Sequence, residues 1–145
     1  MNLFFRFFIT FGLSTGLALA QQKDGVQIRC GASKGHGYFF QDDLTNPDGP
    51  NWSQDGISTG KIVLVRYGEE WDILFDDSVG ASGYRQDGAT VVPLISKGSL
   101  LSVGAFHSNY ADVYTFDFVG RQVAWTSNKL GPIVPKVAVY QANCD

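Results

Sequence analysis

The sequence predicts an all-β protein in which an antiparallel meander of about nine strands forms a closed or flattened β-barrel. Three observations favour this fold. Short stretches of alternating apolar and polar side chains are separated by glycine-rich turns, and helical periodicity is nearly absent beyond residue 20. The third observation is the position of the two cysteines, Cys30 and Cys144, near the two ends of the strand-rich part. A two-sheet β-sandwich is the alternative fold.

Residues 1–20 have the features of a signal peptide. Arg6 precedes a short apolar stretch, and Ala18-Leu19-Ala20 provides the small residues that signal peptidase requires. The stretch is too short and too interrupted by glycine and serine for a good membrane span, and no later segment is long and uncharged enough. We therefore expect a single domain over residues 21–145, secreted or periplasmic, with no membrane span after signal cleavage.

A disulfide between Cys30 and Cys144 is expected, because exported proteins with an even number of cysteines usually oxidise them. The bond would close a loop of about 115 residues and stabilise the fold by about 4 to 5 kcal/mol in the chain-entropy estimate. It would also bring the first and last strands together, as closure of a meander requires.

The predicted strands follow from alternation and turn residues. In chain order they are residues 26–31, 37–42, 61–67, 70–76, 89–95, 99–106, 111–119, 122–127 and 136–143. Segment 32–36, which contains Ser33 and Gly35, predicts a turn between the first two strands, and Gly68-Glu69 predicts the clearest hairpin. Pro93 has no amide donor, so the strand that contains it should lie at an edge or carry a bulge.

Composition and motifs argue against several functions. Without Arg6, ten Lys and Arg stand against fourteen Asp and Glu, a net charge of −4, which disfavours nucleic acids and anionic membranes as partners. No spacing of histidine, cysteine or acidic residues predicts a metal or cofactor. The Gly-x-Ser-x-Gly string around Ser58 lacks the following helix that this motif needs, and the same string occurs within the signal peptide.

The loops predict a binding end. In a meander, alternate connections share one end, which groups the longer segments 43–60, 77–88, 107–110 and 128–135 and leaves short turns at the other end. We therefore expect a non-enzymatic binding protein. It would use either the barrel interior, for a small apolar ligand, or a loop-rich rim that recognises a protein partner. The candidate rim residues are Trp52, Tyr84, Asp48 and Asp55.

A less favoured alternative is a small secreted hydrolase that would use paired carboxylates. The candidates are Asp72, Asp76, Asp77 and Asp117.

Two short motifs suggest another alternative. Ala81-Ser82-Gly83-Tyr84 and Ser96-Lys97-Gly98 resemble the serine-glycine and lysine-glycine loops of bacterial periplasmic C-type lysozyme inhibitors, which are small exported β-barrels with a disulfide. The resemblance implies a protein inhibitor of a secreted enzyme, with Ser82 and Lys97 entering the lysozyme cleft. The predicted strand count, however, places Ser82 at the elaborate end and Lys97 at the plain end.

Overall fold

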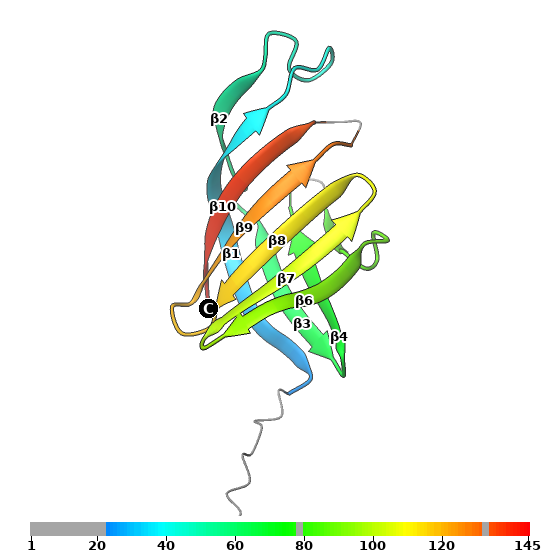
Figure 1. The fold of residues 1–145 in the computed structure, drawn as a ribbon. Helices are drawn as coiled ribbons and strands as arrows, with labels where there is room; N and C mark the ends of the chain where they lie inside the picture. The colour runs from blue at the N-terminus through cyan, green and yellow to red at the C-terminus, as the bar shows by residue number, and fades with distance from the viewer. Residues whose placement is uncertain (1–22, 78–79, 132–133) are drawn as a thin grey trace, which may run out of the picture.

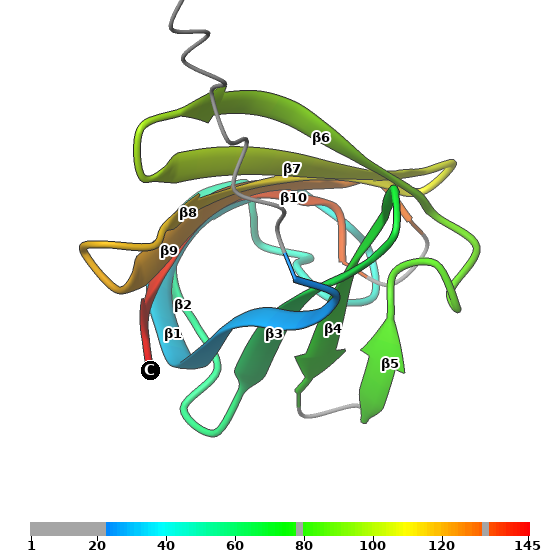
Figure 2. The same ribbon diagram turned by 90° about the horizontal axis from the view of Figure 1, so that it is seen from below.

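The computed structural model describes residues 23–77, 80–131 and 134–145, so the predicted signal peptide lies outside the described residues. Its strands form one antiparallel sheet that curls into a half-barrel (Figures 1 and 2). The all-β prediction is confirmed, and the strands form one sheet rather than the two sheets of a sandwich. No helix that could cross a membrane occurs within these ranges.

Nine strands follow one another across the sheet in the order β5-β4-β3-β1-β10-β9-β8-β7-β6, and β2 pairs with β1 outside this path. The strand bounds are β1 Gly25–Phe39, β2 Asn51–Asp55, β3 Lys61–Tyr67, β4 Glu70–Asp76, β5 Ala81–Gly83, β6 Thr90–Lys97, β7 Leu100–His107, β8 Tyr110–Asp117, β9 Gln122–Lys129 and β10 Lys136–Cys144. The sheet therefore consists of two meanders, β3-β4-β5 and β6-β7-β8-β9-β10, which are joined where β1 pairs with β10.

The predicted turn at residues 32–36 is wrong, because β1 runs through it as one strand of 15 residues. Gly35, the glycine in this segment, allows a close approach between strands rather than a reversal of the chain. Gly35 lies opposite Tyr140 of β10, and a Cβ atom on Gly35 would lie 2.7 Å from Tyr140 Cδ1. A glycine inside a strand often marks such a crowded position.

Two short strands were not predicted. β2 lies within the predicted loop 43–60 and pairs with the outer half of β1, whose other edge pairs with β10 (Figure 1). β5 has three residues and pairs with the end of β4. Both depend on pairing with a neighbouring strand, which local composition does not reveal.

The disulfide prediction is confirmed. Cys30 and Cys144 lie directly opposite each other in the β1–β10 pair and are covalently joined across 114 residues of sequence. The prediction for Pro93 is also confirmed, because β6 is the terminal strand of the sheet and its register shifts between Pro93 and Ile95.

The half-barrel has a seam where β4 and β6 lie against each other. Within the described ranges, no backbone ladder joins these two strands. Arg85 bridges the seam instead, since its Nε donates to the carbonyl of Trp71 (2.7 Å) and its Nη2 donates to that of Val91 (3.0 Å). A side chain thus makes the connection that backbone pairing would make in a closed barrel.

Removing the disulfide should weaken the whole fold. We expect the double variant Cys30→Ala/Cys144→Ala to lose about 4 kcal/mol of unfolding free energy, because the unfolded chain regains the freedom of a long closed loop. Urea unfolding followed by tryptophan fluorescence measures this loss. An unchanged midpoint would contradict the central role of the β1–β10 join.

Candidate ligand-binding site

Strands β7 to β10 carry four parallel rows of side chains on the concave face of the sheet, set by the register of the strand pairs. The apolar row, nearest the plain end, contains Leu101, Phe116, Val123 and Ala142. The aromatic row contains Val103, Tyr114, Trp125 and Tyr140. The small-residue row contains Ala105, Asp112, Ser127 and Ala138. The mouth row, at the loop-rich end, contains His107, Tyr110, Lys129 and Lys136. Polarity therefore rises from the plain end toward the loops.

A cavity of about 440 Å³ opens at the level of the small-residue row. One aspartate, one serine and two alanines have too little side-chain volume to fill the interior there, whereas the bulky aromatic row fills the level below. The opposite wall comes from the other meander, including Ile62 of β3 and Phe75 of β4. Both halves of the sheet are therefore needed to form the cavity.

Tyr84 crosses the interior from the β5 side and reaches β8. Its hydroxyl donates to Asp112 Oδ2 (2.5 Å) and lies 2.7 Å from the hydroxyl of Tyr114. Burial raises the pKa of Tyr84 and of Tyr114 well above the ordinary tyrosine value, and the nearby Asp112 raises both further. Both phenols therefore remain protonated hydrogen-bond donors.

A second polar group lies at the junction of β2 and β10. Lys136 Nζ and the hydroxyl of Tyr140 both donate to Asp55 Oδ2, each at 2.5 Å. Gly35 lies between Tyr140 and Asp55 in the strand register, and its missing side chain leaves room for this contact. Burial raises the pKa of Asp55, but the hydrogen bonds from Lys136 and Tyr140 and the charge of Lys136 outweigh burial and lower it overall.

Two buried polar atoms in the wall have no hydrogen-bond partner within the described part of the chain: Asp112 Oδ1 and Ser127 Oγ. The residues are 1% and 2% exposed and lie directly opposite each other in the β8–β9 pair. Buried polar groups in native proteins are nearly always hydrogen-bonded, so this adjacent pair on the cavity wall is a candidate position for a bound water or ligand.

Aromatic rings surround these atoms. Tyr114 stacks on Trp125, with ring centroids 5.2 Å apart, and Trp125 stacks on Tyr140 at 5.0 Å. Tyr84 meets Tyr110 edge to face at 5.6 Å. At the mouth, the Tyr110 hydroxyl donates to Asp87 Oδ2 (2.7 Å). The cavity thus combines π faces with a few fixed polar groups, as small-molecule sites commonly do.

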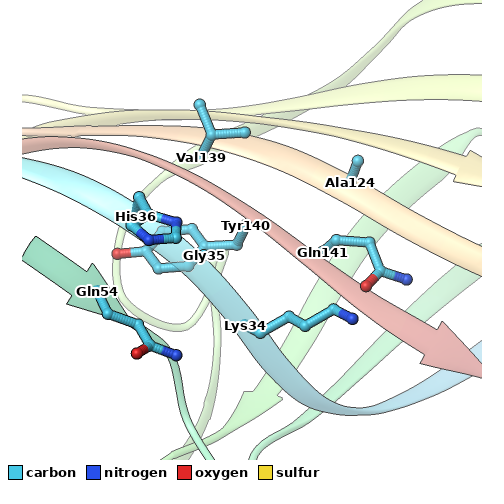
Figure 3. Close-up of a pocket in the computed structure, with 8 residues that line it drawn as sticks. All are labelled: Lys34, Gly35, His36, Gln54, Ala124, Val139, Tyr140 and Gln141. Atoms are coloured by element: carbon cyan, nitrogen blue, oxygen red, sulfur yellow. The ribbon is translucent and has the colours of Figure 1, made fainter.

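A separate hollow of about 480 Å³ lies on the other face of the sheet, over β1, β2, β9 and β10 (Figure 3). Its polar side chains include Lys34, His36 and Gln54, which are all exposed to solvent. Neither of the two unpaired buried atoms lies in this hollow. The inner cavity is therefore the stronger candidate site.

The structure brings two of the four candidate rim residues together. Asp55 and Tyr84 line the inner cavity, whereas Trp52 and Asp48 do not. The rim hypothesis needs Tyr84 at the surface, but only 7% of Tyr84 is exposed, because it crosses the interior to reach Asp112. Trp52 is 71% exposed and packs edge to face on Tyr38, on the outer side of β1 and β2.

Sequence reasoning missed Asp112 and Ser127, although alternation carried a signal for both. Asp112 has the same parity as Tyr114 and Phe116, and Ser127 has the same parity as Val123 and Trp125. A charged residue and a hydroxyl on the buried face of two adjacent strands could have been read as a site.

The other candidate residues are dispersed. Asp76 and Asp77 line the inner cavity, but Asp117 lies at the plain end, where it accepts hydrogen bonds from Ser99 and from the turn after β8. Ser82 is on β5 and Lys97 ends β6 at the plain end, so the two do not share an end. Among the described residues, no group of three or more His, Cys, Asp or Glu side chains is placed to hold a metal ion.

Comparisons of the chain with models of protein families, with curated proteins and with solved structures give no match.

Removing the unpaired hydroxyl should stabilise the protein. We expect Ser127→Ala to raise the free energy of unfolding by about 1 kcal/mol, because an unsatisfied buried group is lost. Ser102→Ala is the matched control, since the Ser102 hydroxyl is paired with that of Thr115 at 2.9 Å, and it should lower stability by about 1 kcal/mol. Urea unfolding distinguishes the two signs, and a loss of stability in Ser127→Ala would contradict the unpaired assignment.

The Asp55–Lys136 ion pair should contribute to the free energy of unfolding in a pH-dependent way. A carboxyl with a lowered pKa stabilises the fold above its unfolded value of about 4, and this stabilisation is lost as pH falls through the lower folded value. We expect Asp55→Asn to cost about 1 to 2 kcal/mol at pH 7 and progressively less below pH 4. Unfolding of both proteins across this pH range measures the difference, with the exposed Asp48→Asn as control. An equal cost at neutral and acid pH would contradict the ion-pair assignment.

Proposed function

We propose that the protein is a secreted or periplasmic binding protein that holds a small organic molecule in the inner cavity and does not transform it. The observation that carries the proposal is the pair of unpaired buried atoms, Asp112 Oδ1 and Ser127 Oγ, on the wall of a 440 Å³ cavity. A protein that needed this region only for stability would gain by replacing both groups with apolar side chains.

Further features support a small-molecule site. Its volume is within the range of known ligand pockets, and its walls are aromatic. The disulfide is compatible with an extracellular or periplasmic location, and the signal peptide predicted in residues 1–20 would direct export.

Two variants on β9 test whether the inner cavity or the outer hollow holds the ligand. Ser127→Leu would block the inner cavity, and Ala124→Leu would block the outer hollow from the opposite face of β9. Native mass spectrometry of the protein from its natural source should detect a retained small molecule in the wild type and in Ala124→Leu, and its loss from Ser127→Leu. Near-ultraviolet circular dichroism checks that both variants are folded. Retention in Ser127→Leu, or loss in Ala124→Leu alone, would contradict the inner site.

Protein binding is the second candidate function, because an aromatic cluster is exposed on β2 and at the end of β1. Tyr38 contacts Phe40 at 5.2 Å and Trp52 at 5.4 Å between ring centroids, and Phe40 and Trp52 are both exposed. Exposed aromatic side chains commonly anchor protein interfaces. A protein partner that binds here should be lost in Trp52→Ala without loss of stability, and unchanged capture would argue against this surface.

A further inference from the structure

Only one of the two carboxyl oxygens of the buried Asp112 has a hydrogen-bond partner among the described residues. Oδ2 accepts the hydrogen bond from Tyr84, and Oδ1, in the cavity wall, accepts none within the described residues. A buried carboxylate is costly unless it is hydrogen-bonded and its charge is balanced. An ionised Asp112 would take a hydrogen-bond donor as the partner of Oδ1, and a positively charged donor would also balance its charge.

Three cationic side chains near the cavity are engaged elsewhere, and Lys129, at the mouth of the cavity, is exposed to solvent. Lys136 is paired with Asp55 at 2.5 Å, and Lys61 with Asp76 at 3.7 Å. Arg85 donates to two backbone carbonyls at the seam. No ion pair to Asp112 occurs in the described part of the chain, so its charge is left for a ligand.

The surroundings of Asp112 also favour a positive ligand over a negative one. Five aspartates and three lysines line the cavity: Asp55, Asp76, Asp77, Asp87, Asp112, Lys61, Lys129 and Lys136. The rings of Tyr84, Tyr114 and Trp125 line the same cavity, and aromatic faces attract cations. The charges and the aromatic rings of the cavity therefore both favour a positively charged ligand.

We propose that the cavity binds a small organic cation, a protonated primary amine whose N–H groups donate to Asp112 Oδ1 and Ser127 Oγ. This inference rests on the proposed function and names its ligand class. An ammonium group has three donors, so it can satisfy both unpaired atoms and still donate a third hydrogen bond. A neutral alcohol has one donor and leaves the carboxylate charge unbalanced. A quaternary ammonium group has the charge but no N–H, so it should bind less well than a primary amine.

Isothermal titration of the mature, disulfide-bonded protein with matched probes tests this. The probes are 2-phenylethylamine, its trimethylammonium analogue, 2-phenylethanol and 3-phenylpropanoate, which share an aromatic body and differ in the polar group. We expect the primary amine to bind at least tenfold more tightly than the alcohol, the quaternary amine to fall between them, and the carboxylate not to bind.

Asp112→Asn keeps the shape of the side chain and removes its charge. We expect it to weaken amine binding at least tenfold and to change alcohol binding by less than twofold. Asp48→Asn removes the same charge from an exposed loop residue outside the cavity and should leave both affinities unchanged. Circular dichroism and the thermal midpoint check that Asp112→Asn is folded, and if it is not, Ser127→Ala provides the second test, with an expected three- to tenfold loss of amine affinity.

The outcomes separate the ligand class from the proposed function. Equal affinities for amine and alcohol, both abolished by Ser127→Leu, would overturn the organic cation and leave the binding cavity in place. A neutral or acidic molecule that the wild type retains from its natural source and that Ser127→Leu loses would also overturn the organic cation and leave the binding cavity in place. An amine affinity that persists in Ser127→Leu, or no amine binding at millimolar concentration, would overturn the inference.

Discussion

The pairing of β1 with β10, covalently fixed by Cys30–Cys144, holds the two halves of the sheet together. β1 carries β2 and β3 on its other edge, and β10 leads into the meander that ends at β6. The cavity takes one wall from each meander. If this pair separated, the core would divide into two sheets, and neither would enclose a site.

The interior is graded along the strand direction. The apolar and aromatic rows pack the plain end, and the small-residue row leaves space beneath the loops. Because strand register aligns like positions, one row of small residues is enough to open a cavity without weakening the rows below it. The tightly packed core and the candidate cavity thus occupy different levels of the same strands.

Tyr84 and Arg85 show how neighbouring residues can complete a sheet that lacks full backbone closure. Arg85 bonds to carbonyls of β4 and β6 at the seam, while Tyr84 bonds to Asp112 on the opposite wall. The segment after β5 therefore both joins the edges of the sheet and determines the shape of the cavity. Tyr84, which the sequence placed in an exposed loop, is therefore part of the interior.

Sequence patterns were sufficient to predict the β class, the β3–β4 hairpin, the disulfide and the edge position of the Pro93 strand. Each depends on alternation, turn chemistry or the chemistry of a single residue, which are local properties. The alternation of side chains also predicts that Asp112 points inward. That Asp112 Oδ1 has no hydrogen-bond partner can be seen only once its neighbours in space are known. Only the three-dimensional contacts explain why Gly35 lies within a strand, since a side chain there would collide with the backbone of Val139 and with Tyr140 on β10. Tertiary structure also decided that β2 forms and that Asp55, Tyr84, Asp112 and Ser127 line one cavity, because these contacts join residues far apart in the sequence and depend on the register of paired strands.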